Sequence, residues 1–255
     1  MIRARKRYGQ HFLHDPAVLA RIVDAINPLP GERLVEIGPG RGALTRPLLK
    51  RAHRLEAIEI DRDIVPELLT HCAGAGELIV HQRDALGVDF TALRGEGRRL
   101  RLAGNLPYNV STPLLFRLLE ARDAIEDMHF MLQKEVVDRI VAPAGGKSYG
   151  RLTVMLAAAC RAQALFRVGR GAFVPAPAVD SAVVRLVPHA TDPFPLPDRE
   201  RFARLVAAAF SMRRKTLRNS LRGLAGPHEF DAAGIDANRR PETLAPAEFA
   251  RLAAV

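Results

Sequence analysis

Short apolar runs alternate with segments of helical periodicity through the first three quarters of the chain. The apolar runs predict strands at Arg33–Ile37, Leu55–Ile60, Leu78–Gln82, Leu100–Ala103 and Met128–Leu132. Between them, apolar residues spaced as on one face of a helix predict helices near 43–51, 63–72, 112–121 and 134–142. Because strands that alternate with helices form βαβ units, we expect an α/β domain built on a mostly parallel sheet.

Proline and aspartate positions predict where several elements begin or end. A helix is expected from about Asp15, a favoured N-cap residue that Pro16 follows at the first helical position. Two more strands, 164–168 and 182–187, flank a proline-broken loop and are predicted to add an antiparallel edge. The proline-rich stretch 188–197 is predicted to be a linker. We therefore expect two domains, residues 1–188 and residues 189–255.

The segment after the linker has apolar residues at helical spacing throughout. They are Phe202, Leu205, Val206, Ala209 and Phe210, followed by Leu217, Leu221 and Leu224. The second domain is therefore predicted to be small and all-helical.

The composition is that of a soluble globular protein, with 255 residues, 48% hydrophobic and 26% charged. A chain of this length buries enough surface to fold without disulfides or a structural metal. The two cysteines, Cys72 and Cys160, form no ligand cluster, and no apolar run approaches the length of a membrane span. We expect a cytoplasmic monomer with no metal and no membrane contact.

Basic residues are concentrated in two segments. The chain carries a net charge of +10, and 33 of its basic residues are Arg against 5 Lys. Residues 1–14 contribute +4 and residues 199–223 contribute +7, so the remainder sums to −1. Genome composition can account for the choice of Arg but not for this distribution. Two basic segments on a near-neutral body indicate a polyanion-binding surface, with a solvated charge run as the alternative.

A glycine-rich loop, Gly38-Pro39-Gly40-Arg41-Gly42, directly follows the first predicted strand. Glycine allows the backbone to approach a ligand closely and tolerates positive φ. The pattern Gly38-x-Gly40-x-x-Ala43 also satisfies a permissive dinucleotide fingerprint. A nicotinamide site and a plain tight turn are both alternatives at this point.

Carboxylates follow at the ends of the next two strands. Glu59 lies twenty-one positions after Gly38, where it can accept hydrogen bonds from both ribose hydroxyls of NAD or of S-adenosylmethionine. Asp84, at the end of the third strand, can accept from an adenine amino group; capping a turn is its alternative role.

The fourth strand ends in Gly104-Asn105-Leu106-Pro107-Tyr108-Asn109, which fits chemistry on an exocyclic amine. Such a nitrogen is a poor nucleophile because its lone pair is delocalised into the ring. Accepting its two hydrogens on the Asn105 side-chain oxygen and the Leu106 carbonyl favours a pyramidal nitrogen. Pro107 stiffens the loop, and Tyr108 offers a face to an extruded base. The alternative is a β-turn with a packed tyrosine.

Eight segments together resemble one family over essentially the whole chain. They are 7–13 (RYGQHFL), 35–40 (VEIGPG), 58–63 (IEIDRD), 104–109 (GNLPYN), 131–136 (MLQKEV), 149–152 (YGRL), 173–181 (FVPAPAVDS) and 210–221 (FSMRRKTLRNSL). The chain resembles the ribosomal RNA adenine N6,N6-dimethyltransferase family, KsgA (RsmA) type. Erm-type enzymes share the glycine loop and an Asn-x-Pro-Tyr motif, but segment 210–221 favours the KsgA type.

The resemblance implies a Rossmann-like methyltransferase domain that binds S-adenosylmethionine and dimethylates two neighbouring adenosines near the 3′ end of 16S rRNA in the assembling 30S subunit. It implies cofactor contacts at His11, Leu13, Gly38, Gly40, Glu59, Ile60, Asp84, Ala85 and Asn105. Many relatives carry Asn at position 11, so a backbone contact there is better supported than a side-chain one. By the same transfer, Phe173 forms the second wall of an aromatic sandwich with Tyr108, or else packs in the core. The catalytic candidates are Asn105, Leu106, Pro107, Tyr108 and Phe173, and the RNA-binding candidates are Arg5, Lys6, Arg7, Arg213, Arg214, Lys215, Arg218 and Arg222.

Two other classes of function remain open from the sequence. A nicotinamide-dependent oxidoreductase explains Gly38 and Glu59 but assigns no role to the Asn105–Tyr108 motif or to the basic segments. An RNA-binding assembly or transcription factor on a methyltransferase fold explains the charge; the intact series Gly38, Glu59, Asp84 and Asn105 argues against loss of the cofactor site.

Overall fold

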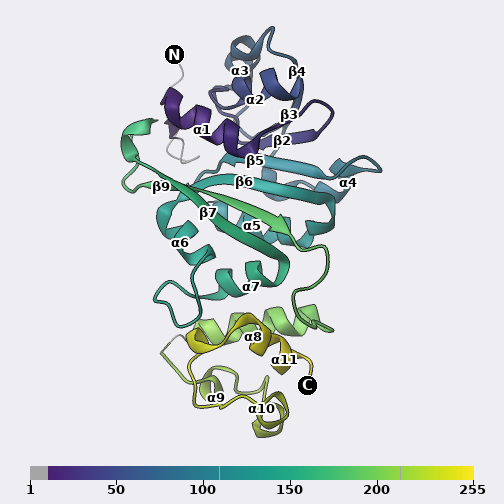
Figure 1. Cartoon of the computed structure of the whole chain (residues 1–255), viewed down its shortest axis with the longest axis vertical. Helices are drawn as coiled ribbons and strands as arrows, with labels where there is room; N and C mark the ends of the chain where they lie inside the picture. Colours follow the sequence, from purple (N-terminus) through teal and green to yellow (C-terminus); the bar gives the residue numbers. More distant parts are fainter. Residues whose placement is uncertain (1–10, 109, 213) are drawn as a thin grey trace. The chain divides into compact units, whose positions relative to one another are not determined.

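The fold was analysed in a computed structural model that describes residues 11–108, 110–212 and 214–255 (Figure 1). The chain divides into two compact units, one formed by residues up to 137 with 163–188, the other by 138–162 with 189–255. The expected junction at 188/189 is one of the borders. Residues 138–162, which we assigned to the first domain, group with the second unit. Within the described residues, no helix is both long enough and apolar enough to cross a membrane.

The first unit is built on a seven-stranded sheet with the order β4-β3-β2-β5-β6-β9-β7. Its strands are β2 (Arg33–Ile37), β3 (Arg54–Glu59), β4 (Glu77–Gln82), β5 (Leu100–Asn105), β6 (Ile125–Gln133), β7 (Cys160–Val168) and β9 (Ser181–Pro188). β4, β3, β2, β5 and β6 are mutually parallel, while β9 pairs antiparallel with β6. The predicted fold class is confirmed, with the antiparallel strand β9 one place in from the edge.

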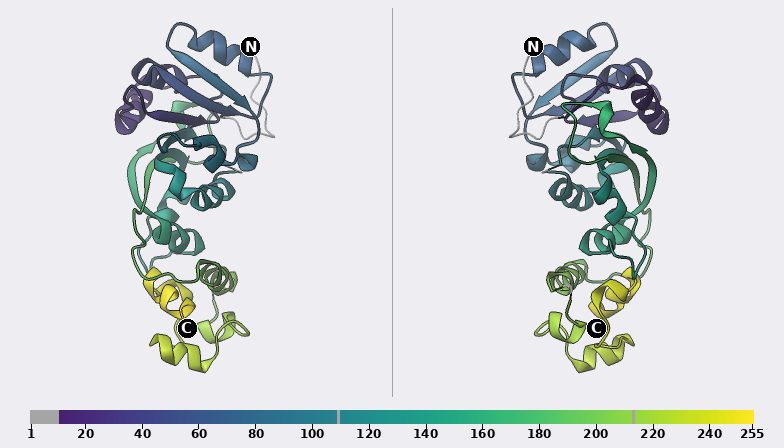
Figure 2. Two further views of the ribbon diagram at one scale, coloured as in Figure 1. Left: turned by 90° about the vertical axis from the view of Figure 1, so that its right-hand side faces the viewer. Right: turned by 90° about the vertical axis from the view of Figure 1, so that its left-hand side faces the viewer.

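Helices cover this sheet, and all of them except α4 lie close to predicted positions. They are α1 (Pro16–Ile26), α2 (Thr45–Ala52), α3 (Val65–Cys72), α4 (Phe90–Arg94), α5 (Ser111–Glu120) and α6 (Lys134–Ile140), with short 3₁₀ turns η2 (Ala85–Gly87), η3 (Arg122–Ala124) and η4 (Arg170–Ala172). The carboxylate of Asp15 caps α1, accepting from Ala17 N at 2.9 Å and Val18 N at 3.1 Å. Apolar residues of α1, α2 and α3 join those of the strands in one core, and Figure 2 shows α1 to α3 on the opposite side of the sheet from α5.

A second, two-stranded sheet was not predicted. β1 (Phe12–Leu13) pairs antiparallel with β8 (Phe173–Val174), with Phe12 opposite Val174 and Leu13 opposite Phe173. The His14 amide also donates to the Ala172 carbonyl at 2.9 Å. This pairing holds the segment at 11–14 beside the loop that follows β8.

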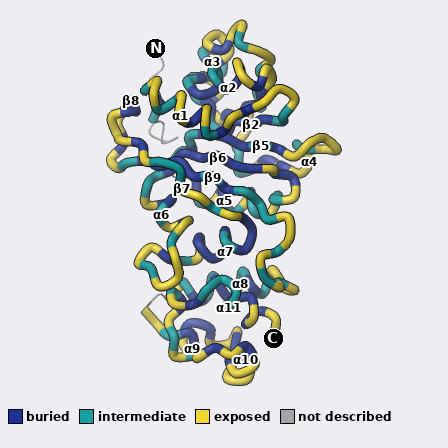
Figure 3. The backbone as a smooth tube through the Cα atoms, viewed as in Figure 1, coloured by how far each residue is buried: buried dark blue, intermediate teal, exposed yellow. Residues whose placement is uncertain are grey.

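The second unit has its own core (Figure 3). Its helices are α7 (Arg151–Ala159), α8 (Arg199–Ser211), α9 (Leu217–Ser220), α10 (Pro227–Ala233) and α11 (Pro246–Ala253), with the 3₁₀ turn η5 (Pro241–Thr243). Every apolar residue used for the helical prediction is buried in or packs against this core, except exposed Leu224. The predicted linker contains neither helix nor strand after Pro188, yet its Phe194 packs on Phe202 with 6.4 Å between ring centroids.

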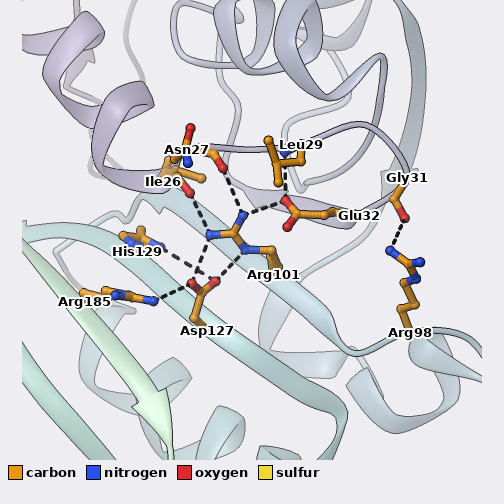
Figure 4. Close-up of polar contacts among 10 residues, drawn as sticks. All are labelled: Ile26, Asn27, Leu29, Gly31, Glu32, Arg98, Arg101, Asp127, His129 and Arg185. Carbon is orange, nitrogen blue, oxygen red and sulfur yellow. Dashed lines mark hydrogen bonds and ion pairs between the residues drawn. The ribbon is translucent and has the colours of Figure 1, made fainter.

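A polar network lies within the first unit, where β5 and β6 approach the end of α1 (Figure 4). The guanidinium of Arg101 donates to both carboxylate oxygens of Asp127, at 2.9 and 3.0 Å, and to Glu32 at 2.6 Å. It also donates to the Ile26 carbonyl at 2.7 Å, one of the carbonyls at the end of α1. A buried charge is costly unless an opposite charge and hydrogen bonds compensate it, and these bonds compensate the Arg101 guanidinium. They also tie the end of α1 to the sheet.

Candidate functional site

The carboxyl ends of the parallel strands open onto one cavity of about 810 Å³. This edge is where ligands bind in open α/β sheets, outside the strand ends. The predicted residues on its wall are His11, Leu13, Gly38, Gly40, Glu59, Ile60, Asp84, Ala85, Asn105, Leu106, Pro107 and Tyr108. The structure thus brings together residues that the sequence placed on four strand ends and one N-terminal segment.

Two glycines allow the close approaches that shape this cavity. Gly40 has φ +55°, and a Cβ there would lie 3.3 Å from the Phe12 ring. Gly104, in β5, has no such φ, but a Cβ on it would lie only 2.4 Å from the Ile37 carbonyl oxygen on β2. A side chain at Gly104 would push apart the two central strands whose ends carry the glycine loop and Asn105.

Glu59 ends β3 beneath the glycine loop. Its carboxylate accepts from Gly40 N at 3.1 Å and from Asp61 N at 2.9 Å, which fixes the loop to the neighbouring strand. Burial raises the pKa of Glu59, partly offset by these two backbone bonds. Glu59 therefore presents a carboxylate of fixed orientation on the cavity wall.

The neighbouring predicted contacts differ in exposure. Asp84 is exposed and its carboxylate accepts from Leu86 N at 2.9 Å, so it caps the short η2 turn while also lining the cavity. Ile60 is an exposed apolar side chain on the same wall. An exposed apolar residue beside exposed Asp84 suits the flat face and polar edge of a purine.

Asn105 is fixed by the N-terminal segment. Its side-chain nitrogen donates to the His11 carbonyl at 3.0 Å, so the side-chain oxygen is the atom left to accept from a ligand. Leu106 N donates to the Met131 carbonyl at 3.2 Å, which anchors the start of the Leu106-Pro107-Tyr108 loop to β6. The backbone of His11, more than its side chain, thus sets the orientation of Asn105.

Tyr108 is held on three sides. Its hydroxyl is 2.9 Å from the hydroxyl of buried Ser181, and its carbonyl accepts from Ser111 Oγ at 3.1 Å. The His11 ring stacks on it, with centroids 5.6 Å apart, and His11 Nδ1 lies 2.8 Å from the Pro175 carbonyl. Burial raises the pKa of Tyr108, so its phenol stays neutral at physiological pH.

Phe173 packs in the core, which was the alternative to forming an aromatic sandwich with Tyr108. Its side chain is 3% exposed, belongs to the apolar core with Leu13, and is absent from the cavity wall, which Val174 and Pro175 reach instead. The reason is its pairing with Leu13 in the unpredicted β1–β8 sheet. The ring stacked on Tyr108 in this structure is that of His11.

Sequence reasoning missed several cavity residues, among them Arg41, Phe12 and Glu36. The Arg41 guanidinium lies over the Phe12 ring, 4.7 Å from its centroid, and pairs with Glu67 at 3.5 Å. Glu36, in the middle of an apolar strand, also lines the cavity and is 1% exposed. The one signal for Glu36 was a lone carboxylate in a buried strand; Arg41 and Phe12 carry no local signal, because their contact depends on where β1 lies.

The described members of the predicted RNA-binding set in the second unit are exposed. Arg214, Lys215, Arg218 and Arg222 all face solvent, while Leu217 and Leu221 between them are buried. No carboxylate among the described residues forms an ion pair with these four side chains. Arg5, Lys6, Arg7 and Arg213 lie outside the described part of the chain.

Comparisons with known proteins give a single family. Residues 1–255 match the model of the ribosomal RNA adenine dimethylase family. "Ribosomal RNA small subunit methyltransferase A" of Nitrosococcus oceani is 54% identical over 250 residues, covering 98% of this chain and 95% of the relative. The protein of the same name from Pseudomonas aeruginosa is 53% identical over 251 residues, covering 98% and 94%.

Two solved structures share the fold over nearly the full chain. A dimethyladenosine transferase from Plasmodium falciparum has a TM-score of 0.79 at 26% identity, covering 95% of this chain and 96% of its own. The 23S rRNA methyltransferase ErmE has a TM-score of 0.74 at 27% identity, covering 95% and 98%. With the full-length match to the family model, these likenesses show that the chain belongs to the ribosomal RNA adenine dimethylase family.

Proposed function

We propose that this protein transfers methyl groups from S-adenosylmethionine to N6 of two adjacent adenosines in the 3′-terminal hairpin of 16S rRNA. The observation that carries the proposal is the orientation of Asn105, whose side-chain nitrogen bonds the His11 carbonyl at 3.0 Å within the strand-end cavity. A substrate amine entering this cavity meets the Asn105 oxygen as its acceptor. The assembling 30S subunit, in the cytoplasm, is the proposed setting, and the protein acts as a monomer.

The cavity fits S-adenosylmethionine by three features of its wall. Gly40 leaves room that a Cβ would fill against Phe12, Glu59 holds a buried carboxylate where a ribose would lie, and Asp84 stands exposed where an adenine amino group would reach. Buried Glu36 Oε2 has no hydrogen-bond partner among the described residues, so an added cation would satisfy it. When bound, this cofactor supplies an electrophilic methyl group on a positively charged sulfur.

Positioning of the amine falls to Asn105 and the loop after it. The Asn105 oxygen and the Leu106 carbonyl accept the two N6 hydrogens, which favours a pyramidal nitrogen whose lone pair points toward the methyl group. After the first transfer one N–H remains, and Asn105 accepts that hydrogen in the second round. No general base is required, because the nitrogen becomes more acidic once it is alkylated and loses its proton to water.

Tyr108 supplies the face on which the extruded adenine stacks. Base–aromatic stacking contributes about 1–3 kcal/mol per base. The Ser181 hydroxyl fixes the phenol ring and the Ser111 hydroxyl fixes the backbone carbonyl of Tyr108, so little rotamer entropy is lost when a base arrives. In this conformation Phe173 is a core residue, so we assign it no contact with the base.

Two basic surfaces are proposed to hold the RNA backbone. Arg214, Lys215, Arg218 and Arg222 are exposed; Leu217 of α9 lies in the core, while Arg218 of the same helix faces solvent. The residues Arg5, Lys6, Arg7 and Arg213 are proposed contacts from the sequence alone. Such phosphate contacts provide affinity and register, while Asn105 and Tyr108 act on the base.

The proposed function is tested with labelled S-adenosylmethionine and small ribosomal subunits from a strain that lacks the enzyme. Nucleoside digestion should recover the label in N6,N6-dimethyladenosine, at up to four methyl groups per subunit. The matched control uses subunits that already carry the modification, which should accept no label. Binding to these subunits without any transfer would instead favour an assembly factor, and a change in NADH fluorescence on titration would favour an oxidoreductase.

A further inference from the structure

Glu36 is a buried carboxylate that takes no part in positioning the substrate amine. It lies on β2 between apolar neighbours, is 1% exposed and lines the cavity. Its Oε2 atom has no hydrogen-bond partner among the described residues. An orphaned carboxylate oxygen in a ligand cavity is costly unless the group is protonated or a ligand compensates it.

The surroundings of Glu36 favour its neutral form while the cavity holds only protein atoms. Burial raises the pKa of Glu36 to about 8; the Thr45 hydroxyl lowers it and the Glu59 carboxylate raises it further. The Cys72 thiol on α3 is close enough to Glu36 for this carboxylate to raise the pKa of the thiol, which Arg46 on α2 lowers. The charged or titratable groups elsewhere on the wall are His11, His14, Arg41, Glu67, His71, Arg83, Asp84 and Tyr108.

We propose that Glu36 is the residue by which the site distinguishes the positively charged methyl donor from its neutral thioether product. The carboxyl group gives up its proton to solvent when the sulfonium cofactor binds and takes one back once methyl transfer has removed the sulfur charge. This inference rests on the proposed function, because it needs S-adenosylmethionine as the donor.

The charges balance through such a cycle. Before transfer, the cavity holds one sulfonium charge and one Glu36 carboxylate. Transfer forms the N–CH₃ bond with the nitrogen lone pair and returns the S–CH₃ bond electrons to sulfur, and the alkylated nitrogen then loses one proton. After transfer both the sulfur and the protonated Glu36 are neutral, the proton being taken up from water. The thioether product therefore has no electrostatic attraction to Glu36 when it dissociates.

The proton released on binding determines how the affinity for the methyl donor changes with pH. A site that releases a proton on binding the donor binds it more tightly as pH rises toward the pKa of the empty site, by up to about tenfold per pH unit. The thioether product, which lacks the sulfur charge, should show less of this increase. The ratio of the two dissociation constants should therefore widen by several-fold between about pH 6.5 and pH 7.5.

The test is isothermal titration calorimetry of the full chain with S-adenosylmethionine and with S-adenosylhomocysteine. Repeating each titration in buffers of different ionisation enthalpy counts the protons released. We expect clear proton release with the sulfonium ligand and little with the thioether. In Glu36→Gln, which keeps the size of the side chain, the difference between the ligands should disappear; in Glu56→Gln, a carboxylate on β3 that does not line the cavity, it should persist.

A spectroscopic measurement covers the case in which Glu36→Gln fails to fold. In wild-type protein, the infrared carbonyl band of a protonated carboxylic acid should weaken when the sulfonium ligand is added and persist with the thioether. Equal proton release with both ligands, or release that survives in Glu36→Gln, overturns the inference and leaves the proposed function standing. Absence of binding by either ligand would instead count against the proposed function itself.

Discussion

The imidazole ring of His11 lies against the phenol ring of Tyr108, with centroids 5.6 Å apart and ring planes inclined by 28°. The carbonyl of the same histidine accepts a hydrogen bond from the Asn105 side-chain amide, and its Nδ1 lies 2.8 Å from the Pro175 carbonyl. One residue from the N-terminal segment therefore contacts both the amine-positioning side chain and the base-stacking side chain. The site depends on the pairing of β1 with β8, which holds His11 there.

Replacing His11 with Ala should lower kcat/KM for RNA methylation by roughly tenfold. The change removes an aromatic pair worth about 0.5–1.5 kcal/mol and the bond to the Pro175 carbonyl. His11→Phe keeps a ring without that bond and should retain more activity than His11→Ala. Steady-state methyl transfer to unmodified subunits measures both, with His228→Ala, an exposed histidine of the second unit, as the control. Equal activity of His11→Ala and wild type would show that the stack has no role.

Replacing Asn105 with Ala should abolish both rounds of methylation. The variant loses the oxygen that accepts an N6 hydrogen and the nitrogen that donates to His11. Asn105→Asp keeps an acceptor but sets a carboxylate against the His11 carbonyl, so we expect it to be impaired as well. Nucleoside analysis of the reacted RNA decides the matter, since normal amounts of dimethyladenosine from Asn105→Ala would refute the proposed role.

Replacing Arg213, Arg214 and Lys215 together with Gln should weaken RNA binding and flatten its salt dependence. Each lost phosphate contact should reduce the slope of log K against log salt concentration by about 0.7–0.9. Cofactor binding should remain intact. A control that removes the same charge from exposed arginines of the first unit is Arg54→Gln, Arg99→Gln and Arg117→Gln. If both triple variants show the wild-type slope, the basic segment is only a solvated face.

Replacing Arg101 with Met should destabilise the protein by about 3–5 kcal/mol. Removal of this guanidinium leaves the buried Asp127 carboxylate without its bidentate partner and frees the Ile26 carbonyl (Figure 4). Denaturant unfolding gives the free energy directly. The double replacement Arg101→Met with Asp127→Leu removes both charges, so it should recover part of the loss; a single variant as stable as wild type would contradict this account.

The stability of the protein should fall as pH is lowered from about 6.5 toward 4. Burial lowers the pKa of His129 from 6.5 to about 4, and nearby Arg101 and Arg185 oppose its protonation further. Below pH 6.5 the unfolded chain binds a proton at His129 that the folded protein does not bind until about pH 4, so stability is lost between these pH values. His129→Leu should show a flatter pH dependence of the free energy of unfolding, measured by denaturant titration at several pH values.

The sequence by itself determined most of the elements and their order along the chain, although β1, β8, α4 and α7 were not predicted. Apolar runs and helical spacing predicted the parallel strands, the antiparallel β9 and the helical second unit, because these patterns follow from which side of each element is buried. Asp15 and Pro16 located the start of α1 for an equally local reason. Residues at strand ends, such as Glu59 and Asn105, could be placed in one cavity because parallel strands end at the same edge.

Only the tertiary structure decided what each of these residues contacts. The pairing of Leu13 with Phe173 buries Phe173 and brings His11 to Tyr108, yet two-residue strands so far apart in the chain leave no periodic signal. The raised pKa of Glu36 likewise depends on its burial by helices and strands from distant parts of the sequence. Local pattern specifies secondary structure, whereas the partners and the desolvation of a side chain are properties of the packed chain.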